Sequence, residues 1–176
     1  MDAVTHCIEA VLSPVVNPPA EGIGYDGLRR AWRHIEAAVR DGADRKARWH
    51  MMMASTEGAM AFVKGLGAVH AMSHAAGRLP ELKLHHGTLN AVMLPAVLRF
   101  NEGTSPEKYE RLAEAMGLPK AADLADAVSA RNRTLGLPRG LAEMGIGEGM
   151  IADLVPHAVA DLSSRTNPRP VDAAAY

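Results

Sequence analysis

The stretch from Leu28 to Val39, with the sequence LRRAWRHIEAAV, decides the fold class of this chain. Its large apolar residues recur at intervals of four, three and four positions; they are Leu28, Trp32, Ile35 and Val39. Residues at this spacing share one face of an α-helix, whereas a half-buried strand would show strict alternation. No such alternation persists anywhere in the chain. We therefore predict an all-α fold, a helical bundle.

Start and stop signals divide the rest of the chain into further helices. The first helix begins essentially at residue 1, without a capping residue, and ends at Ser13-Pro14, before a loop at Asn17-Pro18-Pro19. An uncapped start is what a chain cut from a longer one would show. Asp44 and Ser105 are expected to be N-caps of later helices. Other helices are expected to end near residue 77 and to cover about 89–100, 120–134 and 147–162.

Length and composition narrow the class of protein. The chain has 176 residues, enough for one domain with a real core, and its apolar content of 48% includes only 4% aromatics. The net charge is -1 with both signs interleaved, so no nucleic-acid-binding face is expected. No apolar run is long enough for a membrane span, and the pattern of the first residues does not predict a signal peptide. Cys7 is the only cysteine, which fits a reducing, cytoplasmic location.

Histidines and one aspartate recur at helical spacing. Asp2 and His6 are four apart, His70 and His74 are four apart, and His86 follows a short loop later. Residues four apart on a helix share a face, so each pair directs two potential ligands to one point. Imidazole and carboxylate together suit a divalent metal such as Fe(II), Zn, Co or Ni. The sequence predicts a metal site, the alternative being a set of hydrogen-bonded core histidines.

Other motifs in the sequence were compared with known classes of metal and dinucleotide site. The spacing is not His-Glu-x-x-His and no Glu-x-x-His occurs, which argues against a zinc protease and a di-iron carboxylate bundle. Gly22–Gly27 matches G-x-G-x-x-G, but no strand precedes it, so we interpret it as loop glycines that enter a helix. Trp32, Trp49 and a methionine stripe after Asp44 are expected in the core, and Cys7 is expected to be a packing residue.

Three segments resemble the iron-containing (group III) alcohol dehydrogenases. They are Met1–Ala10 (MDAVTHCIEA), Gly65–His74 (GLGAVHAMSH) and His86–Pro95 (HGTLNAVMLP), and Asn167–Pro170 also fits that family. The resemblance covers essentially the whole chain. Members of that family have an N-terminal α/β domain for the nicotinamide cofactor and a C-terminal helical domain for the metal. The resemblance implies that residues 1–176 form the second domain alone, a single all-helical metal-binding domain and a fragment of a two-domain enzyme.

The resemblance also implies roles for individual residues. The metal would be Fe(II), or Zn(II) instead, and its ligands would be Asp2, His6, His70 and His86. His74 would line the cleft beside the nicotinamide and act as a proton relay. His85 receives no role. NAD(P) would bind through the absent domain, and the reaction would interconvert a small alcohol and its aldehyde or ketone. We expect a homo-oligomer that binds neither nucleic acid nor membrane.

Two other functions compete with this reading. A truncated or degenerate helical module could bind metal or promote oligomerisation without catalysis, and metal binding without cofactor binding would favour it. A haem or electron-transfer bundle is the third alternative, which an absorption spectrum without a Soret band would exclude.

Overall fold

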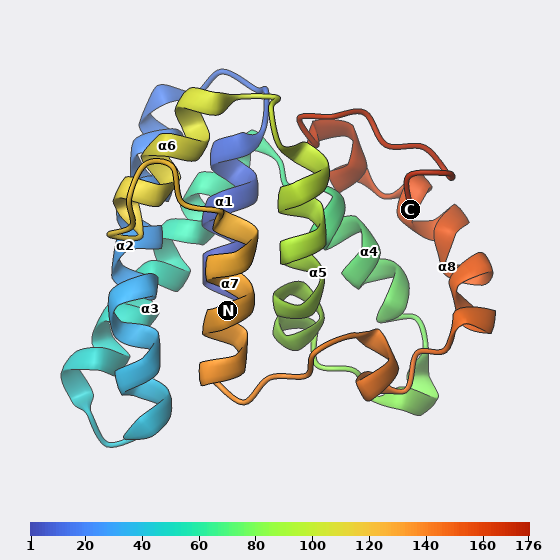
Figure 1. Ribbon diagram of the computed structural model, residues 1–176, viewed down its shortest axis with the longest axis horizontal. Coiled ribbons are helices and arrows are strands. Elements are labelled where there is room, and N and C mark those ends of the chain that lie inside the picture. The colour runs from blue at the N-terminus through green and yellow to red at the C-terminus, as the bar shows by residue number, and fades with distance from the viewer.

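The computed structural model describes all residues 1–176 and is entirely helical, which confirms the predicted fold class. Eight α-helices pack together, as Figure 1 shows. They are α1 (Asp2–Leu12), α2 (Pro18–Arg40), α3 (Arg45–Ala61), α4 (Ala68–Ala76), α5 (His86–Asn101), α6 (Pro106–Ala115), α7 (Leu124–Thr134) and α8 (Glu148–Ala160). Short 3-10 helices lie at η1 (Phe62–Lys64), η2 (Pro80–Leu82), η3 (Leu141–Met144) and η4 (Leu162–Thr166).

Helix α1 is the centre of the fold. It contacts α2, α3, α5 and α6, and its residues from Ala3 to Leu12 are buried with the exception of His6. A helix that is covered on nearly every side must be apolar around its whole circumference, as this one is from Val4 to Leu12 apart from a few polar residues. No side chain caps its first turn, as predicted. The polar residues on α1 are therefore exceptions that need a reason.

Helix α2 is longer than predicted, and the interpretation of Gly22–Gly27 as loop glycines is wrong. Asn17 caps the helix by accepting a hydrogen bond from the Ala20 N–H (3.2 Å), and two prolines occupy the first turn. Gly27 lies where α2 meets α1, and a Cβ there would come within 2.8 Å of Cys7 Sγ. Gly24 and Gly27 permit close helix packing, and the segment forms no phosphate-binding turn between a strand and a helix.

The methionine stripe on α3 is also not in the core. Trp32 on α2 is buried as predicted, but Trp49, Met52 and Met60 on α3 are 52%, 65% and 55% exposed. Helix α3 presents small residues to α1 and α2 instead; they are Ala47, Ala54, Gly58 and Ala61. Because small residues allow the three helices to approach closely, the large apolar side chains of α3 lie on its outer face.

Pro95 lies inside α5, and the fold compensates for it. Proline has no N–H, so the carbonyl of Ala91, four residues earlier, lacks its helical donor. The side chain of Asn132 on α7 donates to this carbonyl (Nδ2 to O, 2.6 Å) and is itself buried. This bond joins α7 to α5 at the position where the helix ladder is interrupted.

Buried cations close the C-terminal end of α1. Lys64 of η1 is 1% exposed, and its Nζ lies 2.8 Å from Oε2 of Glu21. Lys108 of α6 donates to the carbonyls of Val11 (2.8 Å) and Ser13 (3.2 Å). The last carbonyls of a helix have no partner within the helix and carry partial negative charge, so ammonium groups are favourable there.

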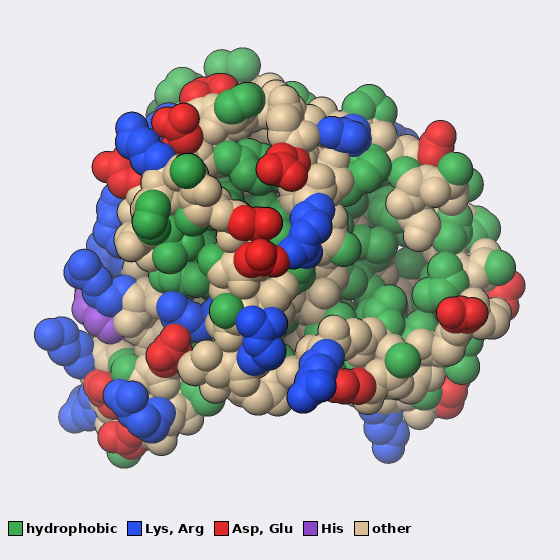
Figure 2. Space-filling model, in the orientation of Figure 1, with side chains coloured by type: hydrophobic (Ala, Val, Ile, Leu, Met, Phe, Trp, Pro, Cys, Tyr) green, Lys and Arg blue, Asp and Glu red, His purple; other side chains and the backbone are tan.

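The surface shown in Figure 2 has no charge of one dominant sign. Lysine, arginine and acidic side chains are interspersed over α6 and α7, whereas hydrophobic side chains line a hollow between α5 and α8. This hollow corresponds to an apolar cavity lined by Met72, Met93, Leu154 and Tyr176, among others. None of the helices has the combination of length and hydropathy that a membrane span requires.

Candidate metal centre

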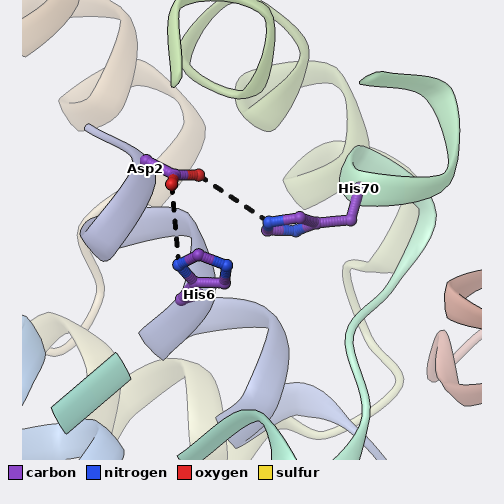
Figure 3. A group of neighbouring side chains, drawn as sticks. All are labelled: Asp2, His6 and His70. Atoms are coloured by element: carbon purple, nitrogen blue, oxygen red, sulfur yellow. Dashed lines mark ion pairs between the residues drawn. The ribbon is translucent and has the colours of Figure 1, made fainter. Parts of the chain in front are cut away.

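Three helices bring the predicted ligand residues to one place. Asp2 and His6 lie on the first turns of α1, His70 lies in the first turn of α4, and His86 is the first residue of α5. One potential ligand atom from each of Asp2, His6 and His70 lies within 4.8 Å of the other two (Figure 3). The i, i+4 spacing on α1 accounts for the first pair. Helix α5 packs against both α1 and α4, and contacts of Glu9 on α1 with Val69 and His70 hold the start of α4 beside them.

The Asp2 carboxylate faces all three histidines. Its Oδ2 lies 3.9 Å from His6 Nδ1, and its Oδ1 lies 3.8 Å from His70 Nε2 and 3.6 Å from His86 Nε2. His70 is 1% exposed, whereas the Asp2 and His86 side chains are 40% and 42% exposed. The cluster therefore has a buried side on α4 and an open side toward solvent. His86 reaches this group only through Asp2, and its role as a ligand stays a prediction.

The electrostatics favour the protonation states that a metal requires. Burial and the neighbouring His70 lower the pKa of His6, and burial likewise lowers the pKa of His86. Burial alone would raise the pKa of Asp2, but His6 and a hydrogen bond from Asn90 outweigh it and lower that pKa. Neutral imidazoles beside an ionised carboxylate are the forms that bind divalent cations.

His74 lies beside the cluster with a partner of its own. Its Nδ1 is 3.0 Å from Oδ2 of Asp161, at the start of η4, and its ring stacks on that of His86 at 5.5 Å between centroids. Burial opposes the charged form of Asp161, yet hydrogen bonds from Ser163 and His74 lower its pKa. The Asp161 contact holds one nitrogen of His74, and the ring is 45% exposed. The second ring nitrogen of His74 has no partner in the structure, and the role of this residue as a proton relay stays a prediction.

Sequence reasoning missed two residues of the site, Glu9 and Asn90. Glu9 is 4% exposed, and its Oε2 lies 2.6 Å from His70 Nδ1. Asn90 is fully buried; its Nδ2 donates to Asp2 Oδ1 (2.6 Å) and lies 3.2 Å from His70 Nε2 and 3.1 Å from His86 Nε2. The signal was present in the spacing, because Glu9 is seven positions after Asp2 and Asn90 is four after His86, on the same helix faces.

The Asn90 amide provides a test of whether a cation fits this place. Its Nδ2 has two hydrogens but faces three acceptor atoms, while its Oδ1 is buried without a hydrogen-bond partner. A buried unpaired carbonyl oxygen beside converging acceptors is a costly arrangement for a purely structural cluster. A donor set of three imidazoles and one carboxylate suits Fe(II) or Zn(II). The residues present therefore fit a divalent metal.

The other histidines and the cysteine lie outside the cluster. His34 of α2 and His50 of α3 stack on each other at 3.9 Å between centroids, an interhelical contact. His85 is 3.2 Å from Thr88 Oγ1, next to the helix start. Cys7 is fully buried, and burial raises the pKa of its thiol to about 12, as expected for a packing residue rather than a nucleophile.

Comparison with known proteins gives consistent matches. Residues 1–175 match the family described as "Fe-containing alcohol dehydrogenase family, C-terminal". A 4-hydroxybutyrate dehydrogenase of Cupriavidus necator is 52% identical over 100% of this chain and 48% of its own length. A 1,3-propanediol dehydrogenase of Citrobacter freundii is 36% identical over 96% of this chain and 46% of its own. The crystal structure of a 1,3-propanediol oxidoreductase, 34% identical, superposes with a TM-score of 0.92 over 99% of this chain and 47% of that one.

The coverage of these matches is unequal. This chain is matched almost completely, whereas it spans about half the length of the curated relatives.

Proposed function

The chain belongs to the Fe-containing alcohol dehydrogenase family, and from that premise we propose that it is the metal-binding, substrate-side domain of an NAD(P)-dependent alcohol dehydrogenase. The observation that carries this proposal is the convergence of Asp2, His6, His70 and His86 from three helices on one partly open point. The cofactor would be contacted through the part of the relatives that this chain does not span.

Each ligand residue has a distinct task in this proposal. His70, buried at the start of α4, would anchor the metal on the closed side, and the half-exposed Asp2 and His86 would hold it on the side that substrate approaches. A bound divalent cation would supply Lewis-acid chemistry, polarising the oxygen of an alcohol or carbonyl group. Asn90, through its hydrogen bond to Asp2, would orient the carboxylate.

His74 would move the proton of the reaction. Because Asp161 holds Nδ1, the other ring nitrogen is left to exchange a proton with substrate or water in the cleft. The partial exposure of the ring gives that proton a path to solvent. A general acid–base group of this kind contributes about 10²–10⁴-fold to turnover.

We further propose a terminal hydroxy acid as the substrate class. The support is similarity alone: the 4-hydroxybutyrate dehydrogenase is 52% identical to this chain, whereas the 1,3-propanediol dehydrogenase is 36% identical.

A chimaeric enzyme would test the function. We would join this chain to the half of the Cupriavidus necator dehydrogenase that it does not match, and measure NAD(P)-dependent oxidation of 4-hydroxybutyrate and of 1,3-propanediol. We expect oxidation of the hydroxy acid, loss of metal and activity in His70→Ala, and retained metal with kcat lowered about 10²–10⁴-fold in His74→Ala. A folded, metal-loaded chimaera without dehydrogenase activity would contradict the proposal, and loss of metal in His74→Ala would refute the relay.

A further inference from the structure

Glu9 is a buried carboxylate whose side-chain hydrogen-bond partners all lie on α4. The residue is two turns into α1, it is 4% exposed, and its side chain contacts the start of α4. Its Oε1 accepts the backbone N–H of Val69 (2.7 Å), and its Oε2 accepts the backbone N–H of His70 (3.4 Å) and lies 2.6 Å from the His70 ring. All of these partners can serve as donors, so the carboxylate is used only as an acceptor.

The first consequence concerns helix α4. No side chain of its own N-terminal region caps this helix. Asn167 Oδ1 accepts the first N–H, that of Ala68 (3.1 Å), but the next two N–H groups would be unpaired in the core without Glu9. Glu9 provides the cap from another helix, where a negative charge is also favourable. The neighbouring Gly67 makes room for it, since a Cβ there would lie 2.8 Å from Glu9 Oε1. One carboxylate thus fixes α4 to α1.

The second consequence concerns the His70 ring. A carboxylate oxygen 2.6 Å from Nδ1 requires a hydrogen on that nitrogen, which leaves the lone pair on Nε2. Nε2 is the atom that faces Asp2 and the rest of the cluster. A histidine that binds a metal through one nitrogen commonly donates the other to a carboxylate, and loss of that partner weakens binding.

We infer that Glu9 is a positioning residue for the metal centre: it holds His70 in the tautomer with the proton on Nδ1 and the lone pair of Nε2 directed at the metal position. The inference rests on the proposed metal-binding function for its purpose. The pairing of Glu9 with His70 can be measured without metal, because both residues are already buried and in contact. Burial of the pair keeps water from competing for the bond.

The tautomer can be read directly from the metal-free chain. Nitrogen-15 NMR of the histidine rings at mildly alkaline pH distinguishes a protonated ring nitrogen from one with a free lone pair. We expect His70 of the wild-type chain to carry its proton on Nδ1. A His70 proton on Nε2 in the wild-type chain would overturn the inference, whether or not any variant folds.

Glu9→Gln separates the two tasks of the side chain, because an amide can accept at only one of its two terminal atoms. With its oxygen retained by the N–H of Val69, its NH₂ group would face Nδ1 and drive the His70 proton to Nε2. We expect a folded variant with the inverted tautomer and an affinity for Zn²⁺, measured by calorimetry, reduced about 10–100-fold. Wild-type affinity in the folded variant would contradict the inference.

Asp161→Asn is the matched control, since it makes the same change beside His74, which is not a predicted ligand. It should leave the Zn²⁺ affinity and the His70 tautomer unchanged; an equal loss of affinity would show that Glu9 has no special role and overturn the inference. If the wild-type chain bound no metal at all, the proposed function would fail, and the His70 tautomer would still decide the role of Glu9.

Discussion

The two ends of helix α1 both carry buried or half-buried polar clusters, and the clusters differ in how they are satisfied. At the C-terminal end, Lys64 and Lys108 share the Glu21 carboxylate and also approach backbone carbonyls, so each ammonium group has an acceptor. At the N-terminal end, one carboxylate faces three histidines, and the carbonyl oxygen of Asn90 has no partner. We call the C-terminal cluster closed, because its ammonium groups have acceptors within the chain, and the N-terminal cluster open, because its acceptors lack donors.

This difference distinguishes polar groups that stabilise the fold from polar groups that are suited to bind a ligand. A buried charge costs little only when it is paired, and the C-terminal cluster meets that condition within the chain. The N-terminal cluster contains acceptors directed at one another, which become favourable together when a cation lies between them. Substitutions at the C-terminal end of α1 should therefore lower the free energy of unfolding, whereas substitutions at the N-terminal end should mainly lower the affinity for metal.

Glu21→Gln should have the largest effect on stability. It leaves the fully buried Lys64 ammonium without its carboxylate, and breaking a buried pair in this way costs about 3–5 kcal/mol. Urea denaturation followed by circular dichroism would measure the free energy of unfolding. Replacing both partners, with Lys64→Met added to Glu21→Leu, should recover most of the loss, and a single variant as stable as wild type would mean that the closed cluster is not structural.

The stability difference between wild type and Glu21→Gln should depend on pH. Burial opposes the charged form of Glu21, but the hydrogen bond from Lys64 and the charges of Lys108 and Lys64 lower its pKa below the ordinary 4.5. A lowered folded-state pKa gives stability that is present above the unfolded-state pKa and lost as the pH falls through the folded one. We expect the gap to be full at neutral pH and to close below pH 4.5. A gap that persisted in acid would exclude the carboxylate as its source.

The sequence could predict the helices and the closeness of Asp2 to His6 because both depend on local spacing, whereas the metal-binding roles stay predictions. Asp2 and His6, and the stripe from Leu28 to Val39, follow directly from the 3.6-residue period. The outer face of α3 could not be predicted in this way, since Met52 and Ala54 are both apolar and only the close approach of α1 and α2 decides which is buried. Glu9 was missed because its partners lie on α4, about sixty positions later.

At the open end of α1, Asn90→Leu should change stability much less than Glu21→Gln. The wild-type amide already has an unpaired Oδ1, and its two hydrogens are shared among three partners. Of these, Asp2 and His86 are exposed enough to bind water, and only the His70 ring is buried. We expect a loss of about 1 kcal/mol or less in the metal-free chain, together with weaker metal binding. A loss as large as that of Glu21→Gln would show that this cluster is structural as well.

The smallest effect is expected on the outer face of α3. Met52 is 65% exposed, so Met52→Lys should change the free energy of unfolding by no more than about 0.5 kcal/mol. Thermal denaturation of Met52→Lys and Glu21→Gln under the same conditions would allow their losses of stability to be compared directly. A destabilisation of several kcal/mol would mean that this methionine is packed after all.

If the N-terminal end of α1 is a metal centre, the purified chain should bind metal in a fixed stoichiometry. Titration with Zn²⁺ or Fe²⁺ under anaerobic conditions, followed by calorimetry, should give one tightly bound ion per wild-type chain. His70→Ala should bind no stoichiometric metal, while Glu21→Leu combined with Lys64→Met should bind as wild type does. Equal metal binding by wild type and His70→Ala, or no binding by either, would contradict the account.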